Sequence, residues 1–151
     1  MRVVLPASGW LMIANVRRCW LSAITSALMG FRGYRLLMAD YLVLTLDVAD
    51  PDVQTAFWCG ALGYEHTGGV GHYRMLTDPS GKGPKLLLQQ VPESKSAKNR
   101  LHLDVHVSDQ EGEAARLVAL GAHRGERVDE FGIFWITMRD PEGNEFCVCA
   151  S

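Results

Sequence analysis

The sequence predicts an α+β fold built from two βαβββ modules, because three landmarks occur twice in the same order. A helix-starting aspartate, a helix-ending glycine and an Asp-Pro turn recur at Asp50 and Asp109, at Gly63 and Gly121, and at Asp78 and Asp140. The members of these pairs are 59, 58 and 62 residues apart. Landmarks repeated in order at a nearly constant spacing indicate a duplicated unit. We therefore expect modules at about 41–92 and 99–151.

The first module begins with a predicted strand over 41–49, where apolar and β-branched residues dominate. Asp50 and Pro51 then supply an N-cap and a first-turn proline, and Gly63 supplies a left-handed C-cap. Two further strands are expected at 72–77 and 85–91, with a turn at 78–81 between them.

The second module repeats this order. A strand over 101–107 leads to the capping-box sequence 108–111, and the helix that follows is expected to end at Gly121. A short segment at 123–128, strands at 134–139 and 145–149, and a turn at 140–143 complete the module. Strand, helix and further strands predict helices on one face of a mixed sheet. The two open sheets would form a cup with the helices on the outside.

Composition and charge restrict the function classes. The chain has 151 residues, 48% of them apolar, and a net charge of −2, which fits one domain with a sizeable core. Residues 1–37 carry +5, so the remainder carries −7. Nucleic-acid binding requires clusters of Lys and Arg, so an acidic domain argues against it and favours a polar or cationic small ligand. The four cysteines have neither zinc-site nor disulfide-framework spacing, which predicts a cytoplasmic protein.

Residues 1–37 are expected to be a non-native or disordered extension outside the domain, which would then span 38–151. The apolar run 19–30 is too short to cross a bilayer. An alternative start at Met38 and a twin-arginine export signal at Arg17 and Arg18 are both compatible with this segment.

The segment 101–107 alternates between apolar and polar residues, which is typical of a half-buried strand. Its polar side carries His102, Asp104 and His106. Such a face lines a cavity or is simply solvated. For His102, a base or a metal ligand and a structural histidine bonded to the next strand both remain open. Asp104 could raise the pKa values of the two histidines or only satisfy their charge.

Three segments resemble the vicinal oxygen chelate superfamily, which includes glyoxalase I, bleomycin-resistance proteins and extradiol dioxygenases. They are 50–64 (DPDVQTAFWCGALGY), 98–104 (KNRLHLD) and 140–146 (DPEGNEF), and the last two are most similar to the glyoxalase-like domain branch. The resemblance covers about 110 residues and implies paired βαβββ modules with the ligand inside the cup, commonly in a homodimer. It also implies a divalent metal in the active members.

The resemblance places the metal ligands at four positions, and only one of them carries a good ligand here. His102 fits, Val43 cannot coordinate a metal, and Cys147 stands where a glutamate is usual. The fourth position falls on Gln89 or Gln90. Fe²⁺ and Mn²⁺ favour imidazole and carboxylate, whereas a His and Cys pair needs further ligands to hold Zn²⁺. Neighbours two apart on a strand are about 7 Å apart, which argues against Asp104 joining His102 on one ion. We therefore expect no metal and no cofactor, with a divalent ion as the alternative.

The repeat also pairs the remaining candidates across the predicted cup. Asp47 and His106 occupy equivalent positions and could form an acid/base pair or a plain salt bridge. Tyr73 and Trp135 are equivalent too and could wall the cavity. The candidate catalytic residues are His102, Asp47 and His106. The candidate ligand-binding residues are Asp47, Tyr73, Gln89, His102, Asp104, His106, Trp135 and Cys147.

Two functions follow from these residues. The first is a metal-independent protein that sequesters a small polar molecule, similar to the bleomycin-resistance branch. The second is a lyase or isomerase of the glyoxalase-like kind, which would use a nonstandard metal set or an acid/base pair. A small-molecule ligand, a homodimer, and no nucleic acid or membrane partner are expected in either case.

Overall fold

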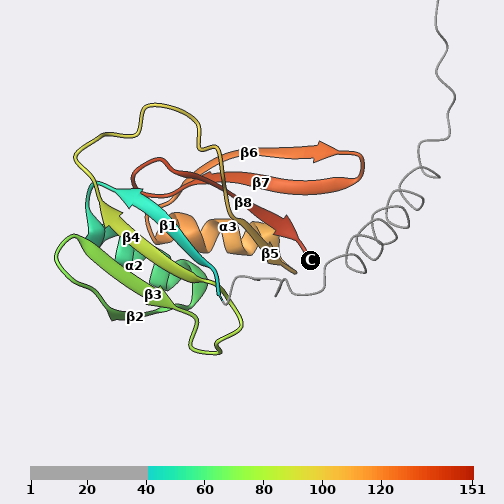
Figure 1. The fold of residues 1–151 in the computed structure, drawn as a ribbon. Helices are drawn as coiled ribbons and strands as arrows, with labels where there is room; N and C mark the ends of the chain where they lie inside the picture. The colour runs from blue at the N-terminus through green and yellow to red at the C-terminus, as the bar shows by residue number, and fades with distance from the viewer. Residues whose placement is uncertain (1–40) are drawn as a thin grey trace, which may run out of the picture. The chain divides into compact units, whose positions relative to one another are not determined.

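Residues 41–151 are described by a computed structural model and contain one helix and four strands in each half (Figure 1). The first module consists of β1 (Val43–Val48), α2 (Pro51–Leu62), β2 (Glu65–Gly68), β3 (Tyr73–Thr77) and β4 (Lys85–Gln90). The second consists of β5 (Asp104–Val107), α3 (Gln110–Ala119), β6 (His123–Glu130), β7 (Ile133–Arg139) and β8 (Glu145–Ala150). The extension expected at 1–37 lies outside the described residues.

The two sheets have the same topology, which confirms the predicted α+β fold of two βαβββ modules with open sheets. The strand orders are β1-β4-β3-β2 and β5-β8-β7-β6. In each sheet the first strand pairs in parallel with the last strand of its module, and the other neighbours are antiparallel.

The structure differs from the sequence prediction in one additional strand and two strand boundaries. β2 was not predicted, because its sequence is EHTG and all four residues are exposed, so no apolar alternation marks it. β6 extends to Glu130 and forms a long hairpin with β7. The strand expected from Leu101 begins only at Asp104, so His102 precedes the regular strand.

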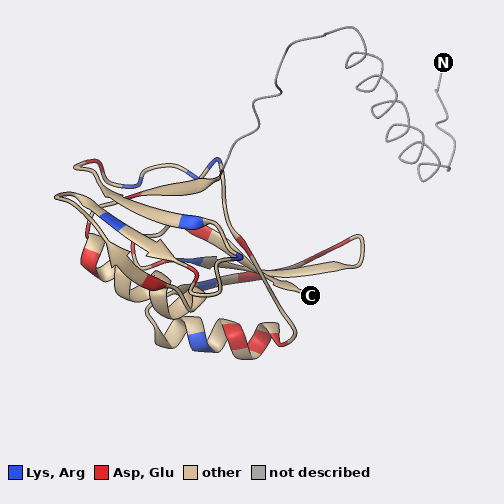
Figure 2. Ribbon diagram, turned by 60° about the horizontal axis from the view of Figure 1, so that its bottom comes forward, with Lys and Arg blue, Asp and Glu red and all other residues tan. Residues whose placement is uncertain are grey.

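Aspartate side chains begin both helices. The Asp50 carboxylate accepts hydrogen bonds from the backbone N–H groups of Asp52 and Val53, and Gly63 ends α2 with a φ of 67°. Asp109 begins α3 by accepting from the Gly112 N–H at 2.9 Å, so the cap is this aspartate and not the Ser108 box. In Figure 2 acidic residues mark the first turn of α3, where the helix dipole favours them. Neither described helix has the length and apolar character that a membrane crossing requires.

The two modules share one apolar core. Phe146 of β8 packs against Phe57 and Trp58 of α2, with ring centroids 6.0 and 5.3 Å apart, and all three side chains are buried. Leu88 of β4 and Val148 of β8 belong to the same core. An aromatic cluster that crosses between modules makes their folding interdependent.

Polar contacts between the modules reinforce this core. The Glu142 carboxylate accepts hydrogen bonds from the backbone N–H groups of Ala49 and Asp50, at 2.8 and 2.7 Å. Arg116 of α3 donates to the carbonyl oxygens of Gly60 and Ala61 near the end of α2. The negatively charged Glu142 therefore lies at the start of α2 and the positively charged Arg116 at its end, where each complements the helix dipole.

Candidate functional site

The second sheet carries an open pocket of about 680 Å³ on the face that does not contact its helix. The pocket is lined entirely by second-module residues and the segment that leads into β5. Among them are His102, Asp104, His106, Trp135, Cys147 and Cys149. A pocket of this size can hold a small organic molecule.

Strand pairing arranges these side chains in two neighbouring rows. Asp104 pairs with Cys147, which pairs with Thr137 on the other side. Two residues further along, His106 pairs with Cys149, which pairs with Trp135. Because side chains two apart on a strand share a face, all of these line the same hollow.

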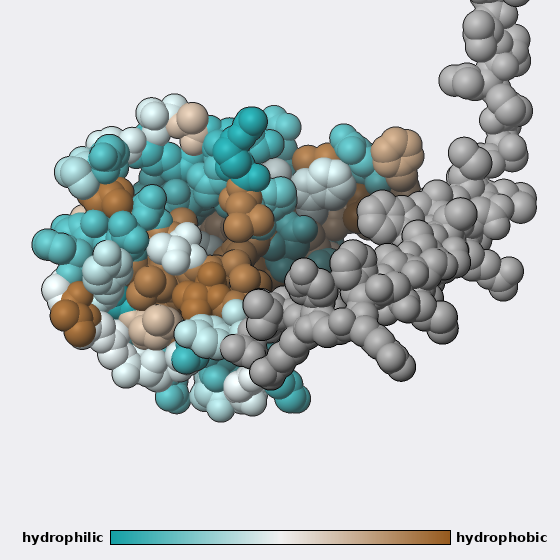
Figure 3. All heavy atoms as spheres, in the orientation of Figure 1, coloured by the Kyte–Doolittle hydropathy of each residue, from teal (hydrophilic) through white to brown (hydrophobic). Residues whose placement is uncertain are grey.

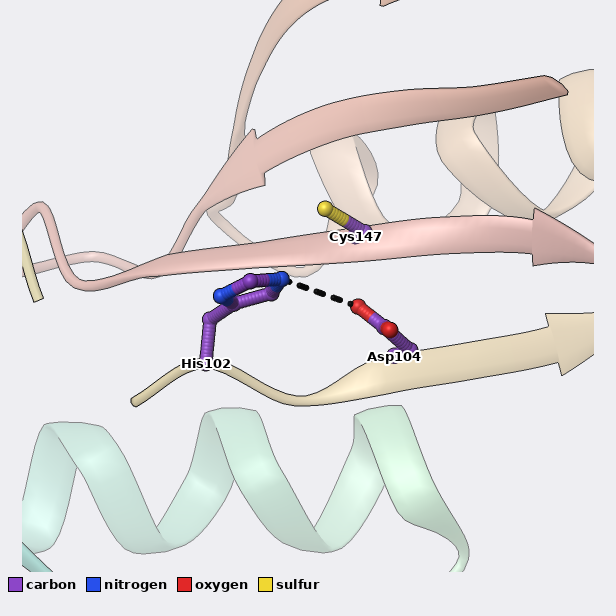
Figure 4. A group of neighbouring side chains, drawn as sticks. All are labelled: His102, Asp104 and Cys147. Carbon is purple, nitrogen blue, oxygen red and sulfur yellow. Dashed lines mark ion pairs between the residues drawn. The ribbon is translucent and has the colours of Figure 1, made fainter. Parts of the chain in front are cut away.

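His102 contacts the first row directly. Its Nε2 atom lies 3.2 Å from Oδ1 of Asp104, and about half of each side chain is exposed (46% and 49%). The sequence argument that these neighbours stay about 7 Å apart is therefore wrong for their ligand atoms. That spacing describes backbone positions in a regular strand, whereas His102 precedes β5 and its ring leans along the chain toward Asp104 (Figure 4).

Cys147 completes a group of three side chains of metal-ligating types. The ligand atoms of His102, Asp104 and Cys147 all lie within 4.8 Å of one another, with the thiol on the adjacent strand β8 (Figure 4). Burial of the thiol, and secondarily the Asp104 carboxylate beside it, raises the pKa of Cys147 to about 11. Burial likewise raises the pKa of Cys149. At neutral pH both thiols of the metal-free protein are protonated.

His106 and Glu145, two further polar residues at the pocket, have structural partners. Nδ1 of His106 lies 3.0 Å from the carbonyl oxygen of Ala150 on β8. Glu145 accepts a hydrogen bond from the Asn99 N–H and forms an ion pair with Lys95. These partners, the Asn99 N–H first, lower the pKa of Glu145 to about 2. Glu145 thus fixes the inter-module segment beside the pocket.

The three first-module candidates form a row of their own. Gln89 pairs with Asp47 on one side and with Tyr73 on the other, and none of the three lines the pocket on the second sheet. Asp47 instead borders a separate hollow of about 720 Å³ beneath the segment 91–97. The expected Asp47–His106 pair is therefore not assembled: within residues 41–151 no ion pair or hydrogen bond joins them.

The register also corrects one assignment made from the repeat. Thr45 pairs with Leu87 in the first sheet as Asp104 pairs with Cys147 in the second. Leu87, rather than Gln89 or Gln90, is therefore the counterpart of Cys147, while Gln89 matches Cys149. The sequence interpretation missed Cys149 as a pocket residue, although its position two residues after Cys147 on the same strand face was a usable signal.

The profile of the glyoxalase-like domain family matches residues 43–149, which is nearly the whole described domain. The chain belongs to this family. No curated protein shows significant sequence similarity to it.

Solved structures show the same fold at low sequence identity. A glyoxalase/bleomycin resistance protein/dioxygenase family enzyme from Burkholderia phytofirmans superposes with a TM-score of 0.63 at 16% identity, covering 74% of this chain and 98% of that one. The fosfomycin resistance protein FosX from Listeria monocytogenes gives 0.62 at 16% identity, covering 76% and 95%. A mutant of that FosX is known in complex with Mn(II) and a dihydroxypropylphosphonic acid.

A metal of that kind does not fit the residues of this glyoxalase-like domain. Of the positions that the superfamily uses, Val43 and Leu87 in the first module bear no donor atom, and Cys147 replaces a carboxylate with a thiol. Figure 3 looks onto the free face of the first sheet and shows apolar side chains gathered over β1 and β4. Of the four positions, the two with donor atoms, His102 and Cys147, lie in the second module, and one donor is sulfur, which hard ions such as Mn²⁺ disfavour.

Proposed function

We propose that this glyoxalase-like domain binds a small polar molecule in the pocket of its second sheet and holds it without the standard metal quartet. The observation that supports this function is the pocket itself, about 680 Å³ with titratable groups on one sheet face. Small-molecule sites commonly combine apolar walls with a few convergent polar groups that orient the ligand.

The lining indicates the chemical class of the ligand. Trp135 offers aromatic surface and Asp104 a carboxylate, and Lys98 is the one lysine at the pocket. Aromatic faces and carboxylates together favour a cationic or hydrogen-bond-donating group attached to an apolar body. Two structural neighbours suggest antibiotics to test, since one belongs to a family whose name includes bleomycin resistance and the other is a fosfomycin resistance protein. Bleomycin, which is cationic, matches this lining, whereas fosfomycin, an anionic phosphonate, is the contrasting compound.

An enzyme is the second candidate, and one observation favours it. The His102–Asp104 contact at 3.2 Å gives an imidazole with an adjacent carboxylate, which orients the ring. A lyase or isomerase of the glyoxalase kind could use this pair, with or without a metal, to move a proton on a bound substrate.

A homodimer in the cytoplasm is part of the proposal. One module alone walls the pocket, so a second copy could cover its open side. The thiols of Cys59, Cys147 and Cys149 are free, as is common in a reducing compartment. Light scattering on the purified chain would measure the oligomeric state.

Calorimetric titration with bleomycin and with fosfomycin tests the binding function. Nuclear magnetic resonance of the same samples, with and without added thiol, follows whether the compound stays intact. Saturable binding of an unaltered compound would support sequestration, and conversion would support the enzyme. If neither compound binds, sequestration of bleomycin and of fosfomycin is wrong. A screen of amphipathic cations would then test the wider ligand class.

A further inference from the structure

His102, Asp104 and Cys147 bring three different metal-binding atoms to one point of the pocket wall. Their nitrogen, oxygen and sulfur ligand atoms lie within 4.8 Å of one another. In residues 41–151 this is the sole group of three or more His, Cys, Asp or Glu side chains that meets this condition. From the sequence, only His102 and Cys147 could be placed at metal-ligand positions. The structure adds Asp104 as a third ligand beside them.

The geometry is close to that of a bound ion. Ligands on a tetrahedral Zn²⁺ at about 2.0–2.3 Å are separated from one another by roughly 3.3–3.8 Å. The His102–Asp104 contact at 3.2 Å lies just below this range. The Cys147 thiol lies no more than 4.8 Å from the other ligand atoms, so a side-chain movement of about 1 Å brings it into this range. His102 and Asp104 are half exposed, so their rotamers can adjust at little cost in packing.

The chemistry of the donors selects the ion. Thiolate favours Zn²⁺ and other soft or borderline ions, imidazole suits Zn²⁺ equally well, and hard ions prefer sites built from oxygen. One sulfur, one nitrogen and one carboxylate oxygen therefore favour Zn²⁺ over Mn²⁺ or Mg²⁺. The plain alternative is an ion pair between His102 and Asp104, which at this exposure would add little to stability.

We propose that His102, Asp104 and Cys147 form a three-residue Zn²⁺ site within the second module alone. On binding, the ion takes the place of the Cys147 thiol proton, which passes to solvent, and a zinc–sulfur bond forms. No electron is transferred, and no first-module residue takes part. This site goes beyond the proposed ligand binding and does not depend on it.

The three ligands leave one coordination position open toward the pocket. All three side chains belong to the pocket lining, so an ion held between them faces the same hollow as Trp135 and His106. Zinc sites with three protein ligands and one open position are typical of sites that contact a small molecule, whereas purely structural zinc sites have four protein ligands.

Zinc titration of the full, untagged chain tests the site. Calorimetry and metal analysis should find one Zn²⁺ per chain. His102→Ala and Cys147→Ser should each weaken binding at least tenfold. Cys149→Ser is the matched control, because Cys149 lines the same pocket but lies outside the group, and its affinity should equal that of the unaltered protein. With Co²⁺ in place of Zn²⁺, the sulfur-to-cobalt absorption should appear in the unaltered protein and in Cys149→Ser, but not in Cys147→Ser.

A gain-of-binding variant guards against loss through misfolding. Cys147→Asp replaces the thiolate with a carboxylate, so it should bind Mn²⁺ at least tenfold more tightly than the unaltered chain while losing the sulfur-to-cobalt absorption.

Three results would overturn the proposal. They are no saturable Zn²⁺ binding, unchanged Zn²⁺ affinity in Cys147→Ser, and equal affinity of the unaltered chain for Mn²⁺ and Zn²⁺. All titrations contain no organic ligand, so failure of the zinc site is distinct from failure of antibiotic binding.

Discussion

The two modules have the same topology, but within residues 41–151 only the second brings three side chains of metal-ligating types together on its free sheet face. The first-module counterparts of His102, Asp104 and Cys147 are Val43, Thr45 and Leu87, as the repeat spacing and strand pairing show. The core-facing side of the two sheets, in contrast, is apolar in both modules. Packing restricts residues that face the core, whereas residues on a free face can change with little effect on the fold. The two modules therefore share a scaffold but differ in the side chains on their free sheet faces.

The largest expected effect lies in the shared core. Phe146 and its counterpart Leu86 are both buried, but Phe146 also contacts the two aromatic side chains of α2. We expect Phe146→Ala to lower the free energy of unfolding by about 4 kcal/mol and Leu86→Ala by about 3 kcal/mol. Chemical denaturation followed by circular dichroism measures both. Only Phe146→Ala should split unfolding into two transitions, and a single transition would show that Phe146 is not the contact that couples the modules.

The two Asp-Pro turns provide the next comparison. Asp140 is fully buried and accepts hydrogen bonds from the N–H groups of Glu142 and Asn144 and from the Asn144 side chain. Asp140→Ala leaves these buried donors unpaired, so we expect a loss of about 3 kcal/mol. Asp78→Ala should cost clearly less, because that carboxylate is only partly buried and water can reach its hydrogen-bond donors. Thermal unfolding of the two variants under identical conditions measures the difference. Equal losses would show that burial does not distinguish the turns.

Ligand binding should depend on one module only. Trp135 and Tyr73 are equivalent, yet only Trp135 lines the pocket. If bleomycin binds there, Trp135→Ala should weaken its affinity about tenfold, which corresponds to about 1.4 kcal/mol of aromatic contact. Tyr73→Ala should leave the affinity unchanged when both are compared by calorimetry. A loss in Tyr73→Ala would indicate that a first-module sheet, in this chain or a partner copy, contributes to the site.

The smallest effect is a pH dependence in the first module. The Ser80 hydroxyl, followed by the backbone N–H of Gly83, lowers the pKa of Asp78 from 3.8 to about 2. A carboxyl group with a lowered pKa in the folded state contributes stability above its ordinary pKa, and this stability is lost as the pH falls from about 4 toward 2. Asp78→Asn should remove this part of the acid sensitivity. Melting temperatures measured from pH 6 to pH 2 test this, and parallel profiles for the two proteins would contradict it.

Local signals in the sequence were sufficient for the fold. The caps at Asp50 and Gly63, the repeated Asp-Pro turns and the apolar periodicities each depend on a few neighbouring residues, and they positioned both helices and most strands. β2 was missed because an exposed polar strand at the sheet edge has no apolar pattern, and its pairing with β3 is a tertiary property.

The sequence by itself determined the duplicated α+β fold and identified His102, Asp104 and Cys147 as separate candidates. Only the tertiary structure decided that the three meet, that Leu87 is the counterpart of Cys147, and that Asp47, Gln89 and Tyr73 lie away from the second-module pocket. The physical reason is that Cys147 is more than forty residues from Asp104 in sequence. Their contact depends on the register between β5 and β8 and on the direction of each side chain, and neither is a property of adjacent residues.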